Sequence, residues 1–410
     1  MRNSSPRSTL ERIVCLIALP LLAASIYSTL RLAAADAAYR ANTTASLQKA
    51  LRLESNNADY HALLAEHLEG ENQNPLPDRL AAARFSPLES KHWIQLALNQ
   101  EIAGDQTKAE QLYLHATEVD KMFAPRWTLM NFYFRRHDST NFWLWTRRTF
   151  EMAYGDQTSA FRLCWLMTDD PHVIESMLPR NAEVRRGYLD FLLATRRFQV
   201  LSPLDREVAE SAEPADVPWL VGYCERTVIV NPRSAVDVWN TLCRRGFEPF
   251  APLAPEKGTV VTNGDFRVNP TGQGFDWRIP VVSGAQVSPR SAGRGISVQL
   301  DGNQPEGCVL LFQTVPLSPG KNYRMSYEYT SDAASPYSGL TWVLLDAVSH
   351  APLAHTGALK ITGDTVSGQA DFTAGVTGAA ELALSYNREP GTVRHEEALT
   401  LRGITIGTQQ

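Results

Sequence analysis

Two hydrophobic patterns divide this chain. Up to about residue 250 the apolar residues follow helical spacing, and beyond it short apolar runs alternate with glycine, proline and asparagine turns. The first pattern predicts helices and the second predicts strands. Between them lies a short segment with three prolines and a glycine, which ends the last helix. We predict four regions: a tail and membrane helix over 1–35, a helical domain over 36–250, a linker over 251–258 and a β-sandwich over 259–410.

An uncharged stretch, Ile13–Leu30, comes before the helical domain. It is long enough to span a bilayer, and the arginines before it place its N-terminal flank in the cytoplasm. The alternative is a cleaved signal peptide, because the small residues Ala33–Ala35 follow. The length of the run and Arg31 before the alanines favour an uncleaved anchor. We therefore expect a single-pass protein of the inner (cytoplasmic) membrane with most of the chain periplasmic.

Large aromatic residues recur in the helical part. Trp93 and Trp127 are 34 residues apart, and Phe161 follows 34 residues later. Small residues at Ala109 and Ala116 accompany this spacing. The pattern resembles the tetratricopeptide repeat family, which implies a solenoid of paired helices that holds other proteins.

One segment of the helical domain is unusually rich in rings. Between Phe132 and Trp145 lie six aromatic residues. Repeat-to-repeat packing explains most of them, but the run from Phe142 to Trp145 is apolar all around a helix. We therefore predict a protein-interaction surface that includes Phe142, Trp143 and Trp145.

The strand-rich part opens with Thr259–Val261 and Asn263–Phe266, which we interpret as its first strand and turn. Many short strands at close spacing are typical of a β-sandwich or jelly roll. The phrase Asn-Gly-Asp-Phe at 263–266, a following Gly274 and Trp277, and the turn before Tyr323 resemble bacterial carbohydrate-binding modules of the jelly-roll type.

That resemblance implies glycan binding and, in the family, a calcium site closed by acids of the last strand. Here Arg402 and Gly403 stand where acids are common, so we expect no metal. A glycan site needs exposed rings beside hydrogen-bonding groups. Our candidate residues, chosen by their loop or strand-edge positions, are Tyr337, Trp342, Tyr329, Tyr386, Asn387 and Arg388.

The composition of the chain mainly excludes classes of function. The net charge of −5 gives no reason to expect a nucleic-acid partner. The five cysteines form no metal or redox spacing, and a pairing of Cys224 with Cys243 stays open. Motifs for metalloproteases, serine hydrolases and phosphate loops are missing from the sequence. We therefore expect no cofactor and no enzymatic activity.

These observations favour a multidomain α plus β protein: a transmembrane helix, a tetratricopeptide-like helical solenoid and an antiparallel β-sandwich. Such a domain pair suggests a scaffold of the cell envelope, with repeats that bind other envelope proteins and a sandwich that binds polysaccharide. Exopolysaccharide or O-antigen assembly or export would use such a scaffold. One alternative is a structural or interaction protein that binds no glycan. A less favoured alternative is a glycan-cleaving enzyme, which requires two carboxylates across a cleft.

Overall fold

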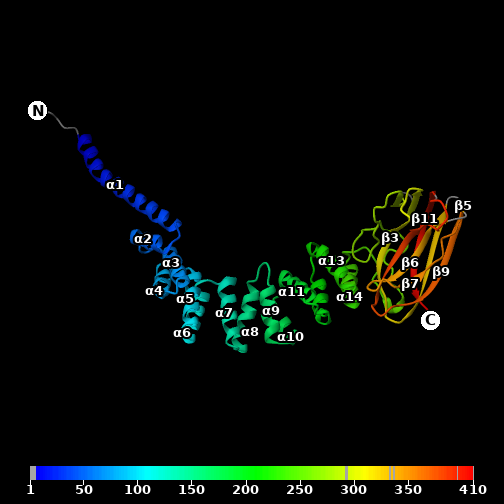
Figure 1. The fold of residues 1–410 in the computed structure, drawn as a ribbon, viewed down its shortest axis with the longest axis horizontal. Helices are drawn as coiled ribbons and strands as arrows, with labels where there is room; N and C mark the ends of the chain where they lie inside the picture. Colours follow the sequence, from blue (N-terminus) through cyan, green and yellow to red (C-terminus); the bar gives the residue numbers. More distant parts are fainter. Residues whose placement is uncertain (1–5, 291–293, 332–333, 336–337, 395, 410) are drawn as a thin grey trace. The chain divides into compact units, whose positions relative to one another are not determined.

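The fold changes from helices to strands along the chain. A computed structural model describes residues 6–290, 294–331, 334–335, 338–394 and 396–409 (Figure 1). Helices run from Pro6 to Arg244, and named strands run from Ala285 to Thr408. The predicted fold class is confirmed. The chain forms two compact units, Met1–Pro179 and Arg180–Gln410, so the last helices belong to the same unit as the strands.

The first unit consists of helices that pair as antiparallel hairpins, such as α5 with α6 and α7 with α8 (Figure 1). Their bounds are α1 Pro6–Arg40, α2 Thr44–Leu53, α3 Ala58–Gly70, α4 Leu76–Phe85, α5 Ser90–Ile102, α6 Gln106–Val119, α7 Phe123–Arg135, α8 Ser139–Glu151, α9 Thr158–Met167 and α10 Pro171–Met177.

The periodic aromatic residues stand near the first turns of successive helices. Trp93 lies in α5, Trp127 in α7 and Phe161 in α9. Side-chain caps begin several of the helices, as where Asp105 accepts from the backbone of Lys108 at 3.0 Å. The small residues Ala109 and Ala116 are fully buried, which lets neighbouring helices approach closely.

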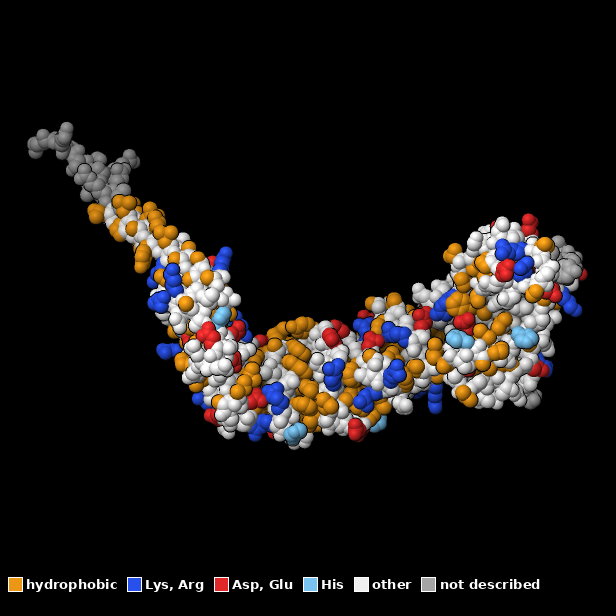
Figure 2. All heavy atoms as spheres, in the orientation of Figure 1, with side chains coloured by type: hydrophobic (Ala, Val, Ile, Leu, Met, Phe, Trp, Pro, Cys, Tyr) orange, Lys and Arg blue, Asp and Glu red, His pale blue; other side chains and the backbone are white. Residues whose placement is uncertain are grey.

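Helix α1 is 35 residues long and contains Pro20. Its segment Leu16–Arg40 is long and apolar enough to cross a membrane. The apolar side chains from Leu16 to Leu32 are exposed along the helix (Figure 2). Towards its C-terminal end, by contrast, Ala35 is fully buried and Ala38 nearly so.

The second unit begins with helices that pack on one another. Their bounds are α11 Ala182–Ala194, η1 Phe198–Val200, α12 Leu204–Glu210, η2 Pro214–Asp216, α13 Val217–Thr227, α14 Pro232–Arg244 and η3 Pro255–Lys257. Trp239 of α14 is fully buried, with ring centroids 5.9 Å from Phe250 and 5.5 Å from Phe275. Glu225 of α13 accepts from the side chain of Arg278 and from the backbone of Gly274, both at 2.7 Å. The helices and the sandwich of this unit therefore pack against each other.

The strands form two main antiparallel sheets. The strand orders are β1-β2-β11-β4-β9 and β3-β10-β6-β7, with a small third sheet, β5-β8 (Figure 1). The bounds are β1 Ala285–Pro289, β2 Ile296–Asp301, β3 Gly307–Pro316, β4 Asn322–Ser331, β5 Ala334–Ser335, β6 Leu340–Asp346, β7 Pro352–His355, β8 Ile361–Thr362, β9 Thr365–Thr373, β10 Ala379–Asn387 and β11 Glu396–Thr408.

The core of the sandwich lies between the two main sheets. Trp277, Trp342 and Tyr323 are among its largest fully buried side chains. Along β6 the buried positions alternate strictly, from Leu340 to Asp346, as expected of a strand with one face in the core.

The expectation of a strand at Thr259–Val261 is wrong, whereas the expected turn at Asn263–Phe266 is present. The chain there forms turns and makes only isolated bridges, such as Ala254 with Thr259. Asn263 and Phe266 have positive φ angles of 51° and 50°, which a regular strand does not allow. Gly264 instead lies directly on β11, where its carbonyl accepts from Ile404 N at 2.8 Å. An added Cβ at Gly264 would come within 2.2 Å of the Ile404 carbonyl.

Candidate ligand-binding site

A cleft of about 660 Å³ lies in the second unit between α14, the segment after it and one end of the sandwich. The residues that line it are Asn231, Pro232, Arg233, Val236, Asp237, Asn240, Leu253, Pro255, Glu256, Pro316, Leu317, Ser318, Pro319, Thr377 and Gly378. Pockets of this volume accommodate small ligands or a short stretch of a polymer. Four separate segments build it, so the cleft depends on tertiary structure.

Helix α14 supplies a polar stripe. Arg233, Asp237 and Asn240 recur at helical spacing and line the cleft. The opposite face buries Ala235, Val238, Trp239 and Leu242, so these apolar residues fix which way the stripe points.

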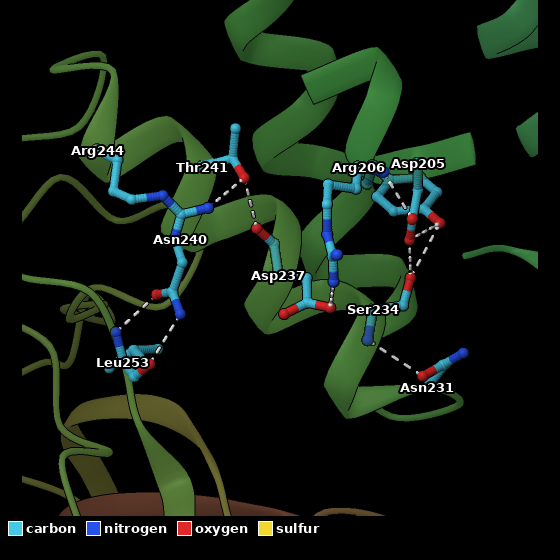
Figure 3. Close-up of polar contacts among 10 residues, drawn as sticks. Asp205, Arg206, Asn231, Ser234, Asp237, Asn240, Thr241, Arg244 and Leu253 are labelled. Carbon is cyan, nitrogen blue, oxygen red and sulfur yellow. Dashed lines mark hydrogen bonds and ion pairs between the residues drawn. The ribbon is translucent and has the colours of Figure 1, made fainter. Parts of the chain in front are cut away.

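The N-terminal end of α14 is held by its neighbours (Figure 3). Asn231 caps it by accepting from Ser234 N at 3.1 Å. Beneath this turn, the buried Asp205 accepts from the hydroxyls of Ser234 and Tyr223. Burial raises the pKa of Asp205. The neighbouring Arg206 donates to Asp237 at 2.5 Å and thereby orients that carboxylate in the cleft.

Asn240 ties the segment after α14 to the helix. Its side-chain amide donates to the Leu253 carbonyl at 2.8 Å, and its side-chain carbonyl accepts from Leu253 N at 2.6 Å (Figure 3). These paired bonds place Pro255 and Glu256 along the cleft. The side-chain amide of Asn240 is thus engaged in these two hydrogen bonds. Its role is to position the residues after α14 that form one wall of the cleft.

The sandwich wall is also well supported. Tyr323 of β4 donates to the Pro255 carbonyl at 3.0 Å and accepts from Ser318 N at 2.9 Å. Leu317 N donates to the Gly378 carbonyl at 2.9 Å. Gly378 has a φ of +71°, and a Cβ there would lie 3.4 Å from Pro232. The sandwich and α14 therefore approach closely at the floor of the cleft.

The cleft combines hydrogen-bonding groups with flat apolar walls. Arg233 and Glu256 are exposed in it, and Thr377 is half-buried. The buried hydroxyl of Ser318 finds no partner among the described residues. Apolar walls come from the rings of Pro232, Pro255, Pro316 and Pro319. Donors, acceptors and apolar faces together suit a neutral ligand rich in hydroxyl groups.

Three of the predicted glycan-binding rings are not at the surface, and the expectation of their exposure is wrong. Trp342, Tyr329 and Tyr386 are 1%, 1% and 2% exposed. Trp342 packs against Trp277 at 6.0 Å between ring centroids, and Tyr329 donates to the Lys360 carbonyl at 2.9 Å. Each ring occupies an inward position of its strand. The sequence alone does not show which face of a strand meets the partner sheet.

The other predicted glycan-binding residues lie apart from the cleft. Asn387 is exposed at the end of β10, whereas the cleft residue Gly378 precedes the start of that strand. Arg388 donates to Glu306 at 2.8 Å and to the Thr392 carbonyl at 2.9 Å. Tyr337 lies outside the described residues. A role of Asn387 and Arg388 in glycan binding stays a prediction.

The predicted protein-interaction residues lie on α8 in the first unit. Phe142 is fully buried and Trp145 is 6% exposed, so the expectation that these two rings are available at the surface is wrong. They pack there because α8 is the second helix of a hairpin with α7. Trp143 is half-buried. Trp145 forms the base of a groove of about 470 Å³ with charged walls, and the Arg148 guanidinium stacks on it at 4.5 Å.

Asp265, the acid of the Asn-Gly-Asp-Phe phrase, pairs with Arg267. Gly403 of β11, which faces the carbonyl of the adjacent Gly264, has no side-chain donor. Within the described part of the chain, three or more His, Cys, Asp or Glu side chains do not gather at any point. Cys224 and Cys243 are both free and buried.

Comparisons with known proteins find similarity in fold only. The chain matches no protein-family model, and no curated protein matches it. A solved structure of the CBM4 module is 15% identical and covers 36% of this chain and 99% of its own, with a TM-score of 0.29. A carbohydrate-binding module (CBM6cm-2) of the Cellvibrio mixtus lichenase 5A, solved with cellotriose, is 13% identical. It covers 32% of this chain and 92% of its own, with a TM-score of 0.23.

The cleft residues were missed at the sequence level. A polar stripe at 233, 237 and 240, opposite an apolar face of the same helix, was the available signal. Neither the residues after β3 nor those before β10 carried any such signal. Only the folded sandwich brings them to α14.

Proposed function

We propose that this chain is a membrane-anchored, non-enzymatic scaffold protein of the cell envelope that binds glycan through its second unit and protein through its helical hairpins. The cleft beside α14 supports the glycan part. It offers exposed charged groups and four proline rings in one space. Assembly or export of an exopolysaccharide or O-antigen would use such a scaffold.

The helical hairpins support the protein-binding part. We assign them to the tetratricopeptide class because an aromatic residue opens α5, α7 and α9 at a constant interval and small residues are buried behind it. The groove over Trp145 is lined by Glu118, Lys121, Arg126 and Glu151. Its mixed charges would suit a partner segment that carries both signs of charge.

The absence of catalysis is also part of the proposal. Two carboxylates, Asp237 and Glu256, do line the same cleft. Asp237 is held by Arg206 at 2.5 Å, and the Glu256 carboxylate lies 3.8 Å from Lys321 Nζ. Neither sits in the apolar surroundings that keep a general acid protonated in glycoside hydrolysis. Both carboxylates are therefore assigned to binding.

A glycan array with the full-length protein in detergent tests this function. We expect the Arg233→Ala and Glu256→Gln variants each to lose about tenfold in affinity, because one charged hydrogen bond contributes roughly 1.4 kcal/mol. The matched variants Asn387→Ala and Arg388→Ala change the other end of β10 and should bind as the parent does. Loss of binding in these two variants alone would place the glycan at that end. A parent protein that binds no glycan would overturn the proposal.

A further inference from the structure

The end of α1 belongs to the helical hairpins. Ala35 is fully buried and Ala38 is 9% exposed, both in a cluster with Ala50 of α2 and Tyr60 of α3. The Tyr39 ring stacks on Tyr60, with centroids 4.8 Å apart. A helix that merely led from the membrane to a folded domain would not contribute to that domain's core.

Helix α2 pairs with the end of α1 over its whole length. After the turn at 41–43 it runs back over Thr44–Leu53, ten residues that match the ten from Arg31 to Arg40. Arg31 forms an ion pair with Glu54, the residue after α2. The end of α2 is therefore level with Arg31, the first charge after the apolar stretch.

We propose that α1 is at once the membrane span and the first helix of the first hairpin, so that the turn between α2 and α3 lies in the lipid headgroup layer. The bilayer then covers the exposed apolar side chains before Arg31, and the lipid headgroups contact the turn at 54–57. This inference rests on the membrane anchoring in the proposed function. It adds that no linker separates the membrane span from the first hairpin.

Helix geometry gives the depth of the two turns relative to the membrane. With a rise of 1.5 Å per residue, the nine steps from Arg31 to Arg40 cover about 14 Å. The headgroup layer is roughly 6 Å thick on each side of the hydrocarbon core. The turn at 54–57 is thus at headgroup depth, and the turn at 41–43 is beyond it. The A-x-A segment Ala33–Ala35 lies inside this hairpin, so cleavage there would remove both Arg31 and Ala35.

Spin labels in proteoliposomes test the placement. Single cysteines replace Asn56, in the α2–α3 turn, or Ala41, in the α1–α2 turn, in a Cys15→Ser and Cys308→Ser background. Both positions are exposed. A lipid that carries a chelated Ni²⁺ ion at its headgroup should relax the label at position 56 several-fold more strongly than the label at position 41. Equal relaxation at the two positions would overturn the inference.

A matched control inserts six glycine and serine residues after Arg31. That variant should remain in the membrane but lose the difference between the two labels, because the hairpin is freed from the span. If it kept the difference, the hairpin would be held by something other than α1, and the inference would fail.

Two further readouts separate this inference from the anchoring itself. Intact mass of the mature protein should include residues 1–35, and the protein should resist carbonate extraction. A mature chain that begins near Asp36 would overturn both the inference and the anchoring, and would leave glycan binding untouched. A full-length membrane protein with equal labels would overturn the inference alone.

Discussion

A carboxyl group in the hairpins and three in the second unit have pKa values shifted in opposite directions. In the hairpins, burial raises the pKa of Glu101, but hydrogen bonds from Arg135 and Tyr113 outweigh it and lower that pKa overall. In the second unit, burial raises the pKa of Asp205, Asp276 and Glu397, in each case against hydrogen bonds that act the other way. Glu101 lies where a neighbouring hairpin supplies its partner Arg135. Glu397, by contrast, is enclosed within the sandwich.

The same contrast holds for the large rings. Trp127 is half-buried and stacks on Phe123, its neighbour in the same helix, at 6.1 Å. Trp277 is fully buried and contacts Phe266 and Trp342 from other segments at 5.5 and 6.0 Å. Solenoid stability is a sum of neighbour contacts, whereas a single core is shared by all of its strands.

The largest expected effect is therefore in the sandwich core. Trp277→Ala should destabilise the second unit by about 3–5 kcal/mol, the usual cost of a large cavity. Trp127→Ala should cost about 1–3 kcal/mol and act on its own hairpin and the adjacent ones. Hydrogen exchange of the full-length protein in detergent localises each loss. Uniform loss of protection over the strands is expected for the first variant only, and local loss in both would contradict the contrast.

The second prediction concerns pH. Glu397 is 6% exposed, accepts from Ser338 at 3.2 Å, and has one oxygen without a partner among the described residues. Burial raises its pKa to about 7. Between the pKa of an unfolded glutamate, about 4.3, and 7, the folded chain therefore holds a proton that the unfolded chain releases. Stability should fall as pH rises through this window, by roughly 4 kcal/mol in all.

Urea unfolding of the second unit at pH 5 and pH 8 checks this. The Glu397→Gln variant should lose much less stability between pH 5 and pH 8, since an amide does not titrate. Asp371→Asn, at an exposed carboxylate paired with Arg324, is the matched control and should keep the parent's slope. If Glu397→Gln and the parent lost equal stability between the two pH values, Glu397 would not be the buried acid responsible.

The same contrast explains which parts of this structure can be predicted from the sequence. Helix starts and the interval between Trp93, Trp127 and Phe161 are local, so the hairpins could be predicted from spacing. The faces of Trp342, Tyr329 and Tyr386 could not, because a strand position is inward or outward only relative to a partner sheet. The cleft was less predictable still. Asp237, Glu256 and Thr377 come from three segments, and only the packing of α14 on the sandwich unites them.

The smallest expected effect is in the hairpins, at the ion pair between Arg135 of α7 and Glu101 of α5. Both nitrogen–oxygen contacts are 2.8 Å, but the Arg135 side chain is 44% exposed. A double-mutant cycle with Arg135→Gln and Glu101→Gln should give a coupling free energy of about 0.5–1 kcal/mol that shrinks in high salt. Because the pKa of Glu101 is lowered, its contribution should be present at neutral pH and be lost as pH falls through that lowered pKa. This acid sensitivity is opposite in sign to that of Glu397. A coupling that is insensitive to salt and unchanged at low pH would contradict a solvent-screened ion pair as its source.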